Sequence, residues 1–157
     1  MDSASESSFL TEHCAQQLGL RRQHSSVQIS GIADIVGGKA TSRVNLVFTS
    51  RFNTTFVYNT NALVLSKVTG LLPRQNIKLN SNWFHLNKLQ LADPKFNISD
   101  RIDVLLGADI FPNLLLSGRR MGRNGEPIAM ETRLGWVLSG KLAEAKHKLK
   151  VHSYHSV

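Results

Sequence analysis

The chain has 157 residues, of which 41% are hydrophobic and 19% are charged, and this balance is typical of one globular domain rather than of a disordered chain. The formal net charge of +8 would suit acidic partners, but basic residues are scattered and aromatic residues are not interleaved with them, which favours a solvated basic surface over a nucleic-acid site. The single cysteine, Cys14, excludes an internal disulfide framework, and no apolar run approaches the roughly 20 residues that span a membrane.

The first predicted element is a helix. Leu10, Cys14, Ala15 and Leu18 are spaced as i, i+4, i+5 and i+8, which places them on one helical face. Gly19 is expected to end this helix, because glycine adopts the left-handed conformation that closes many helices. Cys14 is then a small core residue rather than a nucleophile, and the neighbouring His13 is expected to be exposed.

From Val27 the hydrophobic period changes to two, which is typical of strands. Residues 27–32 and 44–48 predict the two strands of a hairpin, with its tip over residues 34–40. Further strands are expected at residues 56–57 and 62–65. Asparagines are expected to interrupt this strand material: Asn53, Asn59 and Asn61.

The middle of the chain carries a less regular pattern. Residues 83–91 are compatible with either a short helix or a strand, since periodicity does not discriminate over so few residues. Residues 102–106 predict a buried strand and Gly107 a tight bend. Asp109 is expected to cap a helix that begins at Ile110.

The last part predicts a basic loop over residues 119–126 and a final strand over residues 134–140, bounded by glycines. No repeat and no alternation of strands and helices is present, so we expect a mainly β fold, a compact barrel with one or two short helices. The domain is expected to occupy residues 1–140, and residues 141–157 to form a basic C-terminal extension or linker. Because the start is polar and unlike a signal peptide, we expect a cytoplasmic location.

Asp2, Ser3 and Ala4 offer a carboxylate followed by two small residues, which let a loop approach a partner loop closely. Two carboxylates held about 3 Å apart share one proton, so that one acts as base on a water molecule and the other as acid. One such loop per chain implies a two-fold homodimer. The alternative is that this short polar loop only closes a turn or caps a helix.

Four segments in this order resemble the protease region of Bel/Pao LTR retrotransposon polyproteins: DSASESSFLTE from residue 2, LQLADP from residue 89, IDVLLGADIF from residue 102 and TRLGWVLSG from residue 132. That family is similar to the retropepsins, and the resemblance covers nearly all of residues 1–140. It implies a homodimeric, retropepsin-like closed β-barrel that cleaves the element's own polyprotein and needs no cofactor or metal.

The resemblance also implies roles for individual residues. Asp2 matches the catalytic aspartate, and Ser3 and Ala4 match the next two positions of the Asp-Ser/Thr-Gly motif. The flap that closes over substrate matches the hairpin tip, with five candidate residues: Ile32, Ala33, Asp34, Gly37 and Gly38. Structural support of the site is assigned to the hydrophobic-hydrophobic-Gly strand and the acid that follows it: Leu105, Leu106, Gly107 and Asp109.

Three departures from the retropepsin pattern accompany this resemblance. Ala4 stands where most relatives of the wider clan carry Gly, and Ala108 replaces the Arg common in retroviral enzymes, so the ion pairing built on that Arg is absent. A retropepsin has one or two strands before its catalytic aspartate, whereas only Met1 precedes Asp2. We therefore expect a fragment, from either a truncated gene model or a degenerate element copy.

Two functions of different class remain open. The first is an aspartic endopeptidase domain that uses Asp2 from two chains, with a second copy and a polypeptide substrate as partners. The second is a non-catalytic remnant that binds a peptide or partner without cleaving it. Nucleic acid is a weaker third partner, and no membrane partner is expected. A metal site is not expected either, because the histidines of the tail lack convergent ligands: His147, His152 and His155.

Overall fold

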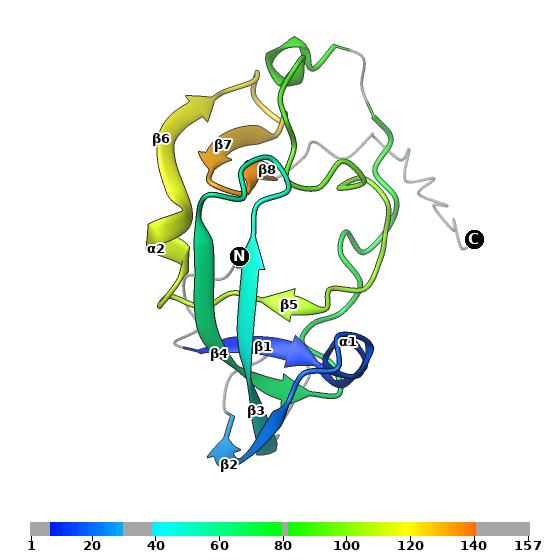
Figure 1. Cartoon of the computed structure of the whole chain (residues 1–157). Helices are drawn as coiled ribbons and strands as arrows, with labels where there is room; N and C mark the ends of the chain where they lie inside the picture. The colour runs from blue at the N-terminus through cyan, green and yellow to red at the C-terminus, as the bar shows by residue number, and fades with distance from the viewer. Residues whose placement is uncertain (1–6, 30–38, 80–81, 141–157) are drawn as a thin grey trace, which may run out of the picture.

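The computed structural model describes residues 7–29, 39–79 and 82–140, which contain eight strands and two short α-helices (Figure 1). The expected mainly β class is therefore confirmed. In chain order the elements are β1 (Ser8–Thr11), α1 (Glu12–Gln17), β2 (Arg22–Gln28), β3 (Lys39–Thr49), β4 (Val57–Leu65), the 3-10 helix η1 (Phe84–Leu86), β5 (Val104–Leu105), α2 (Phe111–Leu114), β6 (Leu115–Arg120), β7 (Ile128–Thr132) and β8 (Gly135–Ser139). None of the helices in these ranges is long and apolar enough to cross a membrane.

Strand β1 lies inside a five-stranded sheet of order β2-β3-β4-β1-β5. It runs parallel to β4, with Ser8 opposite Ala62, and antiparallel to β5, with Phe9 opposite Leu105. All four of its residues are buried. Because alternate side chains of a strand point to opposite faces, Phe9 and Leu10 belong to two different core clusters. Strand β1 therefore supplies both halves of the core.

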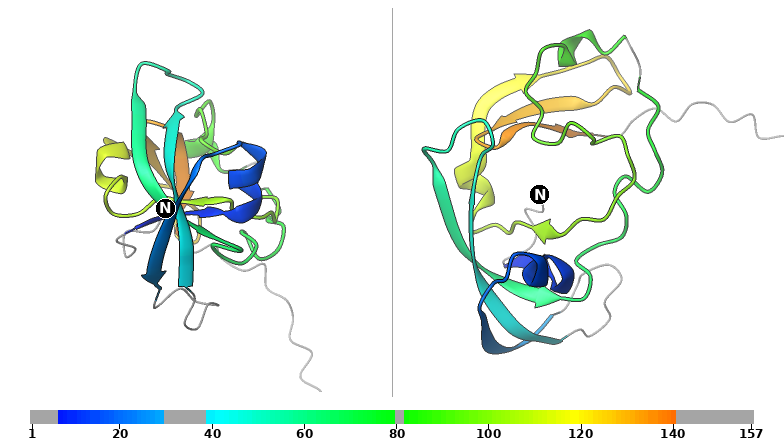
Figure 2. Two further views of the ribbon diagram at one scale, coloured as in Figure 1. Left: turned by 60° about the horizontal axis from the view of Figure 1, so that its bottom comes forward. Right: turned by 45° about the vertical axis from the view of Figure 1, so that its right-hand side comes forward.

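Strands β3 and β4 form a long antiparallel pair whose turn reaches toward the second sheet (Figure 2). Side chains shape this turn, since the Ser50 hydroxyl accepts a hydrogen bond from the Phe52 N–H at 3.1 Å and Asn53 Oδ1 accepts one from the Thr55 N–H at 2.9 Å. Such local bonds satisfy the backbone where the strand pairing stops. The expected break at Asn53 is confirmed.

The second sheet has three strands in the order β6-β7-β8. On its other side β8 pairs with the chain at residues 90–92, because Trp136 donates its backbone N–H to the Gln90 carbonyl and accepts one from Ala92, both at 2.8 Å. Gly135 has φ +113° and lies against this segment, where a Cβ atom would come within 2.7 Å of the Phe52 ring and 2.8 Å of the Gln90 carbonyl oxygen. Only glycine fits both constraints.

The predicted N-terminal helix is confirmed in part. It begins at Glu12 rather than near Leu10, because Thr11 is its N-cap and its hydroxyl accepts a hydrogen bond from the Cys14 N–H at 3.2 Å. Leu10 lies in β1 instead. Gly19 follows the helix with φ +61°, as expected of a terminating glycine. His13 is exposed, as predicted, whereas Cys14 is only half-buried against the core.

A hairpin is confirmed as the β2–β3 pair, but its first strand is shifted, since β2 covers Arg22–Gln28. Of the predicted residues 27–32, only the first two lie in β2, Ile29 follows it, and the others lie outside the described residues. Its predicted tip lies largely outside the described residues. The break expected at Asn59 and Asn61 is wrong, since β4 runs through them without interruption. Their side chains point to the exposed face, where Asn45 Nδ2 donates to Asn59 Oδ1 at 2.6 Å, and pairing on β3 overrides their weak strand preference.

Later in the chain three predictions need correction. The buried strand at residues 102–106 is reduced to the two half-buried residues of β5, because β5 is an edge strand. The basic loop expected at residues 119–126 starts only after β6 ends at Arg120. The closed barrel is not confirmed, because the described strands form two separate hydrogen-bonded sheets.

Leu10 offers a test of the central position of β1. It is 0% exposed and packs among the buried residues of one core cluster, whereas Leu18 is 59% exposed. We expect Leu10→Ala to lower the free energy of unfolding by about 2–5 kcal/mol. Leu18→Ala should change it by less than about 0.5 kcal/mol. Urea unfolding followed by circular dichroism measures both, and equal losses would contradict the central role of β1.

Candidate functional site

The sequence-predicted site falls into two groups. Asp2, Ser3 and Ala4, together with the flap candidates Ile32, Ala33, Asp34, Gly37 and Gly38, lie outside the described residues. The support residues Leu105, Leu106, Gly107 and Asp109 are described. The structure therefore gives the surroundings of strand β1, which follows Asp2, Ser3 and Ala4 closely in the chain.

Ser8, the first residue of β1, is 0% exposed and bonds to the loop after β5. Its Oγ accepts a hydrogen bond from the Gly107 N–H at 3.1 Å and donates one to Asp109 Oδ1 at 3.3 Å. These partners lie about a hundred residues away in sequence, so this hydroxyl joins the two ends of the domain. The buried N–H of Gly107 gains its acceptor from this contact, which satisfies a group that is costly to leave unpaired.

Asp109 is held by a second hydroxyl, because Thr60 Oγ1 of β4 donates to its Oδ2 at 2.7 Å. Thr60 is only 7% exposed. The prediction that Asp109 caps a helix is wrong: α2 begins after Ile110 and has no side-chain cap. The carboxylate accepts from two sheet hydroxyls instead, and thereby joins the β5–α2 loop to β1 and β4.

The other end of β1 carries a similar contact. Thr11 Oγ1 donates to Asp103 Oδ1 at 2.6 Å, the Thr11 N–H donates to the Asp103 carbonyl at 2.8 Å, and Arg101 pairs with the same carboxylate at 3.0 Å. Ser8 and Thr11 therefore anchor both ends of β1 to residues 101–109. Sequence reasoning missed four members of the site: Ser8, Thr11, Asp103 and Thr60. The available signal was a hydroxyl residue on each side of the apolar pair Phe9-Leu10.

Cys14 is not arranged as a nucleophile. Burial raises the pKa of its thiol above the ordinary 9.0, and the negative charge of Asp103 raises it further, while Arg101 acts in the opposite direction. The reactive form of a cysteine is the thiolate, so this environment suppresses reactivity near neutral pH. Its sequence-based interpretation as a packing residue is consistent with these surroundings.

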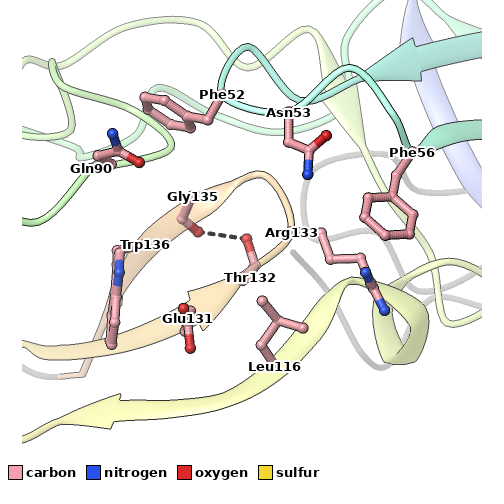
Figure 3. A pocket seen from close by; sticks show the side chains of 10 residues that line it. All are labelled: Phe52, Asn53, Phe56, Gln90, Leu116, Glu131, Thr132, Arg133, Gly135 and Trp136. Atoms are coloured by element: carbon pink, nitrogen blue, oxygen red, sulfur yellow. Dashed lines mark hydrogen bonds between the residues drawn. The ribbon is translucent and has the colours of Figure 1, made fainter.

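A hollow of about 180 Å³ lies between the β3–β4 turn and the second sheet. Figure 3 shows the ten residues that line it, among them three aromatic side chains and Arg133. Sequence analysis did not find this hollow, because its lining comes from residues between 52 and 136 with no shared motif. The described residues contain no group of three or more side chains able to hold a metal ion.

No family model, curated protein or solved structure matches the chain. The resemblance to Bel/Pao protease regions is thus carried by its four sequence segments alone.

Removal of the Ser8 hydroxyl tests the anchor of β1. Ser8→Ala leaves the buried Gly107 N–H without its acceptor and takes one donor from Asp109, so we expect a loss of about 1–3 kcal/mol in the free energy of unfolding. Ser26→Ala, at an exposed position of β2, is the matched control and should be nearly neutral. Urea denaturation measures both variants, and a neutral Ser8→Ala would show that the contact adds no stability.

Alkylation measures the environment of Cys14. The rate of reaction with iodoacetamide, followed from pH 7 to 10.5, should rise with a midpoint above 9.0 in the folded chain and near the ordinary value in urea. Since the folded pKa is the higher one, the protonated thiol contributes stability below the unfolded pKa, and this contribution is lost as the pH rises through the folded pKa. Identical midpoints in the two states would contradict the raised pKa.

Proposed function

We propose that this chain is one half of a homodimeric aspartic endopeptidase, with Asp2 of each subunit contributing one carboxylate. The observation that carries the proposal is the double anchoring of β1. Asp2, Ser3 and Ala4 are followed in the chain by the buried strand β1, whose first residue, Ser8, bonds to Gly107 and whose last residue, Thr11, bonds to Asp103. Acid–base catalysis requires a carboxylate that is held in position, and a strand anchored at both ends close to Asp2 in the chain supports this requirement.

The chemistry follows from two carboxylates that share one proton. The ionised Asp2 takes a proton from a water molecule, whose oxygen attacks the carbonyl carbon of the scissile peptide bond. The protonated Asp2 of the second subunit donates its proton toward the carbonyl oxygen. In the resulting tetrahedral intermediate the C–N bond breaks as the first Asp2 gives the proton it took from water to the leaving nitrogen, and the second Asp2 takes its proton back from a hydroxyl of the intermediate. Ser3 would hydrogen-bond across the two-fold axis and Ala4 would leave room for the partner loop.

The support residues add to the proposal through contacts with β1 rather than through an ion pair. Leu105 lies opposite Phe9 and packs against its core cluster, and the Gly107 N–H donates to Ser8. Position 108 carries alanine, so no arginine charge is present there. Instead, the carboxylate of Asp109 accepts hydrogen bonds from the Ser8 and Thr60 hydroxyls and so connects the β5–α2 loop to the sheet.

The retropepsin-like barrel and its flap belong to the same proposal. The last residue pair of the β2–β3 hairpin is Gln28 opposite Lys39, so the two ends of the connecting segment lie next to each other in the sheet. The flap candidates from Ile32 to Gly38 lie in that connection. Strands β2 and β5 form the edges of the larger sheet, and closure of a barrel would require further strand pairing at these edges.

Substitution of Asp2 tests the proposal. In a fluorogenic peptide-library assay between pH 4 and 6, Asp2→Asn should lower the cleavage rate by about 10²- to 10⁴-fold, because the amide neither takes nor gives the shared proton. Asp93→Asn, in the exposed turn where Asp93 bonds the Lys95 N–H, removes the same charge and should retain activity. Equal cleavage by the wild-type and Asp2→Asn chains would rule out the peptidase.

The concentration dependence of the activity tests whether the chain acts as a dimer. Specific activity should rise with chain concentration, and an excess of Asp2→Asn subunits should inhibit wild-type chains, since each mixed dimer holds one carboxylate. If the folded wild-type chain binds peptides without cleaving them, and binding does not depend on Asp2, the non-catalytic remnant is the correct alternative.

A further inference from the structure

The hollow at the second sheet combines aromatic rings with arginines. Phe52 and Phe56 come from the β3–β4 turn, and Arg133 and Trp136 from the β7–β8 hairpin. Figure 3 shows Phe56 and Arg133 at one side of the hollow, and Phe52 and Trp136 toward the other. The two phenylalanine side chains are 40% and 43% exposed, so part of each ring remains accessible to a ligand.

An arginine guanidinium group lies over each of three rings that line the hollow. The guanidinium carbon of Arg133 lies 4.3 Å from the ring centre of Phe56, that of Arg51 lies 4.6 Å from Phe52, and that of Arg120 lies 5.8 Å from Trp136. All the guanidinium–ring contacts seen among the described residues are thus gathered at this hollow. Stacked cations and rings form flat platforms that are positively charged.

The charge of this platform is not neutralised by ion pairs. The salt bridges within residues 7–29, 39–79 and 82–140 involve Arg22, His85 and Arg101, and none involves the three stacked arginines. Arg51 donates to the Leu91 carbonyl, which carries no net charge. The lining itself holds one arginine, Arg133, and one carboxylate, Glu131. Arg51 and Arg120 are not lining residues, but they stack on two of its rings and add two positive charges next to the hollow.

We propose that this hollow binds single-stranded nucleic acid. Unpaired bases stack on exposed rings and guanidinium planes, while the phosphates between them pair with the same arginines. The amides of Asn53 and Gln90 lie in the lining, where they can meet base edges. An acidic peptide would satisfy the charges but would leave the flat stacking surfaces unused. The overall charge of +8 favours the same ligand by long-range attraction.

The structure brings together basic and aromatic residues that are not interleaved in the sequence. Arg51 and Arg133 are 82 positions apart in the chain, and Arg120 and Trp136 are separated by a whole strand, so no interleaved motif is visible in the sequence. Folding brings these residues around one hollow. The proposal is independent of the peptidase function, because none of these residues belongs to the Asp2 loop or to the contacts of β1.

Fluorescence anisotropy with a labelled 12-nucleotide oligo(U) or oligo(dT), titrated with the full chain, tests the proposal. Three phosphate contacts predict a slope of about −2 for the logarithm of the association constant against the logarithm of salt concentration, or roughly a 20-fold loss between 50 and 200 mM salt. Phe56→Leu should weaken binding by about 5- to 100-fold through lost stacking. Arg133→Gln should weaken binding and reduce the slope by about 0.7.

Two matched variants serve as controls. Arg74→Gln removes the same charge, and Phe84→Leu the same ring, at exposed positions outside the hollow, and both should bind as the wild-type chain does. Circular dichroism confirms that each variant is folded. Equal weakening by Arg74→Gln would show a general basic surface. Equal binding of duplex DNA, or equal competition by poly-glutamate, would show that stacked bases are not recognised. Each of these results overturns the proposal.

Discussion

The hydrogen bonds at the two ends of β1 are the interactions on which the larger sheet depends. Ser8 and Thr11 are polar residues at fully buried positions, and each is satisfied by a group between residues 103 and 109. Burial of an unsatisfied hydroxyl is costly, so β1 is stable in this position only when the distant β5 segment is present. The folding of the N-terminal strand and of the segment around Gly107 is therefore coupled.

Phe9 and Leu10 also hold β1 from both faces of the sheet. Asp109 extends this coupling to β4 through Thr60. In the proposed peptidase, two carboxylates would share a proton only at close separation, so an anchored strand β1 close to Asp2 in the chain would support this chemistry.

The second sheet is attached to the first through the β3–β4 turn. Gly135 lets the turn and the segment at residues 90–92 approach β8 closely, and Arg51 donates to the Leu91 carbonyl at 2.7 Å. This contact zone is also where the aromatic rings and arginines gather. The junction of the two sheets thus presents a hollow lined by aromatic rings and Arg133.

The sequence by itself determined the local features. Period-two patterns predicted the β2–β3 hairpin, Gly19 marked the end of α1, and Asn53 marked the turn before β4, because each of these depends on backbone preferences within a few residues. Only the tertiary structure decided that Asn59 continues a strand, that Asp109 bonds to Ser8 and Thr60 rather than caps a helix, and that three arginines stack on three rings. Those outcomes depend on partners tens of residues away, and local propensity does not carry that information.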